Sequence, residues 1–133
     1  MRSMLKVSFI LAVMALCLGG GARAFAQQSV TANIPFDFVV SGKTHNAGAY
    51  DMRVINNDQT IEFKGPSRNG GFVEVMTRIA GPEIHGSEGR LVFDHVGTLY
   101  YLSEVWLPDQ EGFLLYAAKQ PHTHHAVKLH KQT

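Results

Sequence analysis

Residues 30–40 read VTANIPFDFVV, and every second side chain from Val30 to Val40 is apolar. Because successive side chains of a β-strand point to opposite faces of its sheet, this alternation predicts a strand with one buried face. Pro35 has no N–H group for a hydrogen-bonded ladder, so we expect a sheet edge or a bulge at that residue.

The same alternation recurs in short runs along the rest of the chain, separated by turn residues such as the Asn-Asn-Asp of residues 56–58. No stretch beyond residue 26 has a convincing helical period. Short strands with turn signals at intervals of about 8–12 residues predict an all-β fold of about seven strands, either a small antiparallel sandwich or a barrel. The expected strands cover residues 30–40, 50–54, 61–63, 72–79, 91–96, 99–107 and 113–118.

A hairpin centred on Gly97 and Thr98 is the best defined of these elements. Glycine at the first of two loop positions suits a type II′ turn. Both faces of the hairpin are substantially apolar, so we expect either that it is covered on both sides or that one face meets a ligand or a partner. The turn predicts three cross-strand pairs, namely Phe93 with Leu102, Asp94 with Tyr101, and His95 with Tyr100.

The first 26 residues have the pattern of a secretory signal peptide. Arg2 and Lys6 precede an apolar run over residues 7–18, and the Ala-Phe-Ala of residues 24–26 is a cleavage motif before Gln27. We expect the protein to be exported, to the periplasm or the extracellular space, and not to span a membrane after cleavage. The expected segments are the signal peptide 1–26, an all-β domain over residues 27–118, and a His-rich flexible tail over residues 119–133.

Composition narrows the classes of function. The whole chain has 12 Lys and Arg against 11 Asp and Glu, for a formal net charge of +1. Cleavage after Ala26 removes three basic residues and no acidic one, which leaves nine against eleven and a net charge of −2. The mature chain therefore has no basic footprint for nucleic acid. The only cysteine, Cys17, lies within the signal peptide, so we expect neither disulfides nor thiol chemistry in the mature domain.

Four segments resemble a family of small exported bacterial proteins that has no assigned function. Residues 34–38 match its Ile-Pro-Phe-x-Phe pattern, residues 42–43 its Gly-Lys, and residues 47–50 its Ala-Gly-x-Tyr. Residues 100–106 are similar to its late aromatic strand. The resemblance spans about residues 30–119 and implies export and a compact β domain, without implying any catalytic residues.

We find no nucleophile elbow, zinc-protease helix, phosphate loop or dinucleotide fingerprint in the chain. The sequence therefore favours a non-catalytic binding module for an unknown small molecule, a glycan or an envelope protein, with a homodimer as a further possibility. Export and the aromatic hairpin support this interpretation. A small periplasmic enzyme with a site near His95 and Glu104 is an alternative. The candidate ligand-binding residues are His95, Tyr100, Tyr101, Glu104 and Trp106.

A second alternative is a divalent-metal-binding protein, because histidines gather near the C-terminus. In an extended backbone His122 and His124 point the same way, as zinc or copper ligands can. No Asp or Glu lies nearby in the sequence to complete a site, so we expect weak binding of Zn²⁺, Cu²⁺ or Ni²⁺. The candidate metal ligands are His122, His124, His125 and His130.

Overall fold

The computed structural model describes residues 29–66, 69–80, 89–108 and 111–131. Among these residues no helix is long and apolar enough to cross a membrane. The expected signal peptide lies outside the described residues and stays a prediction. The described strands are β1 (Ser29–Ile34), β2 (Phe38–Val40), β3 (Lys43–His45), β4 (Gly48–Ile55), β5 (Thr60–Lys64), β6 (Gly70–Glu74), β7 (Thr77–Ile79), β8 (Arg90–Val96), β9 (Leu99–Trp106), β10 (Gly112–Leu114) and β11 (Thr123–Lys131).

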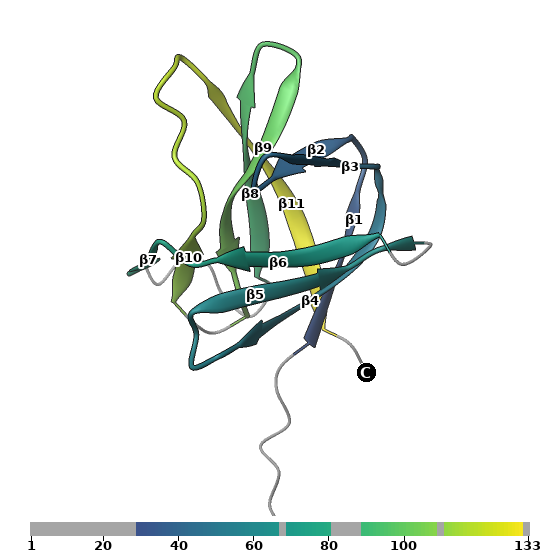
Figure 1. Ribbon diagram of the computed structural model, residues 1–133, viewed down its shortest axis with the longest axis vertical. Coiled ribbons are helices and arrows are strands. Elements are labelled where there is room, and N and C mark those ends of the chain that lie inside the picture. Colours follow the sequence, from purple (N-terminus) through teal and green to yellow (C-terminus); the bar gives the residue numbers. More distant parts are fainter. Residues whose placement is uncertain (1–28, 67–68, 81–88, 109–110, 132–133) are drawn as a thin grey trace, which may run out of the picture.

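The strands form one sheet that curls into a nearly closed barrel (Figure 1). Its order is β3-β2-β9-β8-β11-β1-β4-β5-β6, and β10 pairs with both β9 and β7. All pairs are antiparallel except a short parallel contact between β2 and β9, at Val39 and Tyr101. The all-β class is confirmed, and the barrel is the alternative that the structure adopts. The expected number of strands was too low because two long runs, over residues 30–40 and 72–79, each break in two, and because β3 and β11 were not expected.

The run over residues 30–40 breaks at Pro35. Strand β1 ends at Ile34 and pairs with β4 and β11, whereas β2 begins at Phe38 and pairs with β3 and β9. Between them, a carboxylate oxygen of Asp37 accepts a hydrogen bond from the backbone N–H of Ala47 at 2.8 Å. The proline therefore marks the place where the chain leaves one set of partners for another, as its missing N–H requires.

The β8–β9 hairpin has the expected turn, with Gly97 at a φ of 59°. The three predicted pairs nearest the turn are confirmed, but a bulge beyond Phe93 shifts the register by one residue. Val92 consequently faces Glu104, and Leu91 faces Val105. Continued without a bulge, the predicted register would place Glu104 and Trp106 on the face of Leu102, but the extra residue of the bulge turns Val105 into the core in their place.

The expectation of a flexible tail is wrong for residues 123–131, which form β11. This strand pairs with β8 through Thr123–Lys128 and with β1 through Leu129–Lys131, so it joins the two halves of the barrel. Most of its side chains are exposed and only Leu129 is fully buried in the core. The apolar pattern is weak in this segment, and the strand is held mainly by its backbone pairing with β8 and β1.

Inward side chains from nearly every strand fill the barrel. The core has an aromatic centre in which the ring of Phe38 packs edge-on against Tyr50 and Phe93, with centroid separations of 5.0 and 5.6 Å. The buried cluster comprises Val30, Ala32, Ile34, Phe38, Val40, Tyr50, Met52, Ile61, Phe63, Val73, Leu91, Phe93, Leu102, Val105, Leu107, Phe113, Leu115 and Leu129.

Two adjacent glycines of β6 differ in the space that β5 leaves for a side chain. A Cβ atom on Gly70 would overlap the carbonyl oxygen of Phe63, whereas one on Gly71 would make an ordinary contact of 3.6 Å with the Phe63 ring. We expect Gly70→Ala to destabilise the fold by about 1–3 kcal/mol, since backbone must move. Gly71→Ala should change stability by less than about 0.5 kcal/mol. Urea denaturation of both variants measures this, and equal midpoints would contradict the pairing of the two strands.

Candidate functional site

The five candidate residues of the hairpin do not gather into one site. His95 and Tyr100 stack on each other close to the turn of the hairpin, with ring centroids 4.1 Å apart and planes 1° apart. Tyr101 lies on the other face and stacks on Tyr116 at 4.8 Å. Glu104 is half-buried, and Trp106 is buried at 4% exposure. The hairpin thus provides two separate aromatic surfaces, and His95 is not placed beside Glu104 as the enzyme alternative requires.

Three side chains of metal-ligating types, one carboxylate and two imidazoles, cluster on the outer face of β8 and β11. Asp94 of β8 is directly opposite His124 of β11, and His122 precedes β11 by one residue. The Asp94 Oδ1 atom lies 3.0 Å from His124 Nδ1 and 3.9 Å from His122 Nε2. One ligand atom from each residue lies within 4.8 Å of the others. The two histidines point the same way, as their spacing predicts, and Asp94 supplies the carboxylate that the nearby sequence lacks.

The carboxylate of Asp94 is the unusual member of this cluster, because its residue is only 1% exposed. Its Oδ2 atom accepts a hydrogen bond of 3.1 Å from the backbone N–H of Ala118. Its Oδ1 atom makes no hydrogen bond within the described residues, since His124 Nδ1 is near but poorly aligned. A carboxylate removed from water is stable only with compensation from a hydrogen bond, a cation or a proton. Among the described residues Oδ1 therefore has no hydrogen bond, and its nearest partners are the two imidazoles, which carry a positive charge only when they are protonated.

The structure places His125 and His130 away from this cluster. His125 lies on the inner face of β11, where its ring is 5.3 Å from those of His95 and Tyr100. His130 lies at the far end of the strand, opposite Thr31 of β1. Of the four predicted metal ligands, only His122 and His124 come together with a carboxylate.

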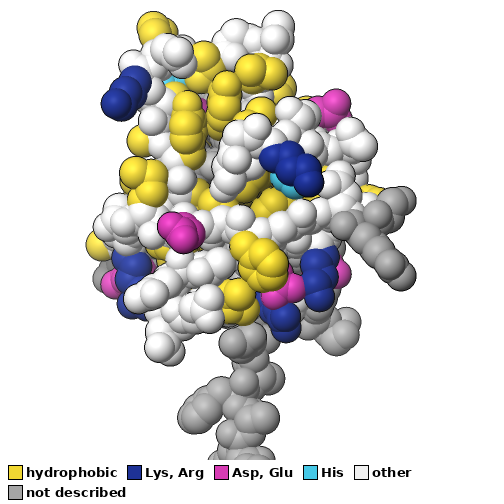
Figure 2. Space-filling view, viewed as in Figure 1, with side chains coloured by type: hydrophobic (Ala, Val, Ile, Leu, Met, Phe, Trp, Pro, Cys, Tyr) yellow, Lys and Arg dark blue, Asp and Glu magenta, His cyan; other side chains and the backbone are white. Residues whose placement is uncertain are grey.

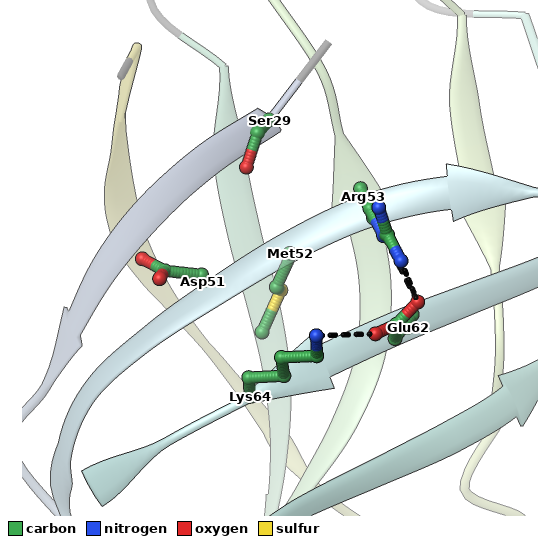
Figure 3. A pocket seen from close by; sticks show the side chains of 6 residues that line it. All are labelled: Ser29, Asp51, Met52, Arg53, Glu62 and Lys64. Carbon is green, nitrogen blue, oxygen red and sulfur yellow. Dashed lines mark hydrogen bonds and ion pairs between the residues drawn. The ribbon is translucent and has the colours of Figure 1, made fainter. Parts of the chain in front are cut away.

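A polar hollow of about 160 Å³ lies over β1, β4 and β5 (Figure 3). Glu62 accepts hydrogen bonds from Arg53, the shorter of 2.7 Å, and forms an ion pair with Lys64 at 3.2 Å. The Arg53 hydrogen bonds hold the pKa of the Glu62 carboxyl below its usual range, against the opposing effect of burial. The charges neutralise one another, so this hollow has the character of a stabilising network. Its lining is Ser29, Asp51, Met52, Arg53, Glu62 and Lys64.

This network predicts a pH-dependent contribution to stability. A carboxyl with a lowered folded pKa stabilises the fold above its unfolded pKa of about 4.3, and this contribution is lost as the pH falls through the folded pKa. We expect Glu62→Gln to destabilise the protein by about 0.5–1 kcal/mol at pH 7, because both cationic partners are substantially exposed. The difference from wild type should vanish in strong acid. Glu74→Gln, on an exposed side chain of β6, is the control, and an equal effect there would exclude a role for the ion pairs.

A second hollow, of about 220 Å³, lies between β2, β6 and β9. We call it the seam cleft, because β6 is the last strand of the sheet order and does not pair with β2 or β9. One wall is the segment over residues 115–122 between β10 and β11, which we call the strap. The cleft is lined by Val39, Val40, Ser41, Gly42, Val73, Tyr101, Leu102, Leu115 and Tyr116.

Comparison with protein-family models, curated proteins and solved structures finds no match for this chain. The site must therefore be interpreted from its own geometry. Among the hairpin candidates, Tyr101 lines the seam cleft. Asp94, which the sequence did not single out as a ligand, is the residue that makes the histidine pair chemically distinctive.

Proposed function

We propose that this protein is a non-catalytic β-barrel that binds a divalent transition metal ion through Asp94, His122 and His124. The observation that carries the proposal is the buried Oδ1 atom of Asp94, which has no hydrogen bond and faces two imidazoles. A bound cation would neutralise this carboxylate, and the imidazoles would supply neutral nitrogen ligands. From the signal-like pattern of residues 1–26, we also propose that the protein acts outside the cytoplasm.

The distances between the donor atoms support a small divalent ion. Ligand bonds of about 2.1 Å in a tetrahedral zinc site place the donor atoms about 3.4 Å apart. The separations from Asp94 Oδ1 to the two histidines, 3.0 and 3.9 Å, bracket this value. Two imidazoles and one carboxylate suit Zn²⁺, Cu²⁺ and Ni²⁺ better than Ca²⁺ or Mg²⁺, which prefer oxygen ligands. Three protein ligands leave at least one position for water.

The solvent exposure of the two histidine side chains supports a site that takes up its metal ion from solution. The side chain of His124 is 62% exposed and that of His122 is 23% exposed, while the Asp94 side chain is 2% exposed. An ion would therefore approach from the histidine side and reach the carboxylate last. His122 is already oriented, because its Nδ1 atom lies 2.8 Å from the backbone oxygen of Gln120. When His122 Nδ1 carries the proton and donates it to this oxygen, Nε2 is left free for a metal.

Isothermal titration calorimetry with ZnCl₂, NiCl₂ and CuCl₂ tests the proposal on the wild type and four variants. We expect one ion per chain, and a loss of affinity of at least about 10-fold in His124→Ala and Asp94→Asn. His125→Ala and His130→Ala are matched controls on the same strand and should bind as the wild type does. Equal losses in all four variants would indicate adventitious binding by exposed imidazoles and would overturn the proposal.

A further inference from the structure

The strap crosses the outer face of the barrel, where two buried side chains form hydrogen bonds with its backbone. Ser103 of β9 donates its hydroxyl to the backbone oxygen of Tyr116 at 2.6 Å, and its own backbone oxygen accepts the N–H of Leu115 at 2.7 Å. Asp94 of β8 accepts the N–H of Ala118. Strap residues 115–122 are not part of any strand. These hydrogen bonds, the burial of Leu115 in the core and the stacking of Tyr116 on Tyr101 together hold the strap in place.

Asp94 connects the strap with the proposed metal site. Its Oδ2 atom holds the strap at Ala118, while its Oδ1 atom faces His122, the last residue of the strap, and His124, the second residue of β11. An ion bound to Oδ1 and both imidazoles would fix Asp94 and the C-terminal end of the strap at once. The strap would then be tied at Ser103, at Asp94 and at the metal.

The strap also forms a wall of the seam cleft, through Leu115 and Tyr116. The Tyr116 ring stacks on Tyr101 with the two planes 18° apart, so the strap carries half of this aromatic pair. Figure 2 shows hydrophobic side chains gathered on this face, over β9 and the strap. A strap that moves changes the shape of the cleft, because its opposite wall lies on β2 and β6.

We infer that the seam cleft binds a small aromatic molecule with a hydroxyl substituent, and that metal at Asp94, His122 and His124 tightens this binding by fixing the strap. The second half of this inference rests on the proposed metal function. The cleft itself does not, since none of the proposed metal ligands lines it.

Size and lining argue for this class of ligand. An apolar cavity of about 150 Å³ holds benzene, so the 220 Å³ of the cleft accommodates one substituted ring. Most of its wall is apolar, from valines and leucines of the core rim, and the tyrosine pair offers ring faces and edges for aromatic contact. Ser41, Tyr101 and Tyr116 carry hydroxyl groups on the lining residues, which suits a ligand with one polar substituent.

Titration of the ¹⁵N-labelled protein with phenol, followed by NMR, tests both halves. We expect phenol to shift the amide resonances of Val73, Tyr101 and Tyr116, with an affinity about 5-fold higher in saturating Zn²⁺ than in EDTA. Val39→Trp should abolish binding by filling the cleft, because Val39 is a half-buried lining residue. Thr44→Trp is the matched control, since Thr44 is exposed opposite Val39 on β3 and does not line the cleft.

His124→Ala separates the two halves, because it removes a metal ligand and leaves the Asp94–Ala118 hydrogen bond intact. This variant should bind phenol as the zinc-free wild type does, whether or not zinc is present. Shifts that are absent, or that persist in Val39→Trp, would overturn the cleft as a site while leaving the metal function standing. Equal phenol affinity in Zn²⁺ and EDTA, in a wild type that calorimetry shows to bind zinc, would overturn the coupling. If calorimetry finds no zinc site, the proposed function and the coupling fall together, and the zinc-free titration still decides the cleft.

Discussion

A chain that ends at Lys119 is expected not to fold cooperatively. The truncation removes β11, which is the only strand that pairs with both β8 and β1 in the described part of the sheet. Two strand edges would then lie open in the middle of the barrel wall, and the core would lose Leu129. A stability of about 5–15 kcal/mol, usual for a domain, cannot absorb the loss of a nine-residue strand paired on both sides. Circular dichroism during urea denaturation should show no sigmoidal transition.

The matched control is a chain that ends at Lys131, which keeps all of β11. It should unfold with the midpoint of the full chain. A cooperative transition in the shorter chain, with a similar midpoint, would show that β11 is an accessory to the fold and that the sheet closes without it.

The same strand shows where sequence patterns stop being informative. Alternation over residues 30–40 and the glycine turn at Gly97 are local signals, and they predicted the all-β class and the hairpin pairs correctly. Strand β11 has no comparable signal, because its outer side chains are polar and its inner face carries few apolar residues. Its position follows from long-range pairing with β8 and β1, which no local window contains.

The bulge in the hairpin is a second limit of the same kind. An unbroken register places Glu104 and Trp106 on the face of Leu102, and nothing in the composition of the strand contradicts that arrangement. The structure inserts one extra residue, so that Val105 is buried beside Leu91 and Glu104 is only half-buried. Burying valine in place of a carboxylate avoids the desolvation of a charge. The residue types of β9 favour this arrangement, but the position of the bulge also depends on how β9 pairs with β8, which the sequence of β9 alone does not show.

The sequence predicted the two histidines of the candidate site but not its aspartate. The spacing of His122 and His124 indicated that their side chains share a face, and this geometry is present. Asp94 could not be assigned to them, because its distance along the chain is bridged only by the pairing of β8 with β11. The predicted pair of Asp94 with Tyr101 placed the two residues on one face of the hairpin, but the sequence did not show that His124 of β11 lies on the other side of Asp94.

Zinc is expected to raise the melting temperature of the full chain by about 10–20 °C when its free concentration is about 100 times the dissociation constant. Binding to the folded state alone then stabilises it by about 2.7 kcal/mol, and each kcal/mol shifts the melting temperature of a small domain by about 4–8 °C. Differential scanning calorimetry measures the shift. It should shrink below about pH 6, because protons compete with metal for imidazole nitrogens, whose usual pKa is about 6.5. His124→Ala should lose the shift, and His130→Ala should keep it.

Asp94→Asn gives this experiment its sharpest contrast. The substitution removes a buried negative charge, and the carbonyl oxygen of the new amide can still accept the N–H of Ala118. The metal-free variant should therefore melt no lower than the metal-free wild type, although it loses the zinc shift. This combination is expected if the buried carboxylate is needed for the proposed metal site and not for the hydrogen bond to the strap. The opposite result is that the metal-free variant melts far lower than the wild type and that zinc changes the melting temperature of neither protein. Asp94 would then only hold the strap in place, and the metal function would be excluded.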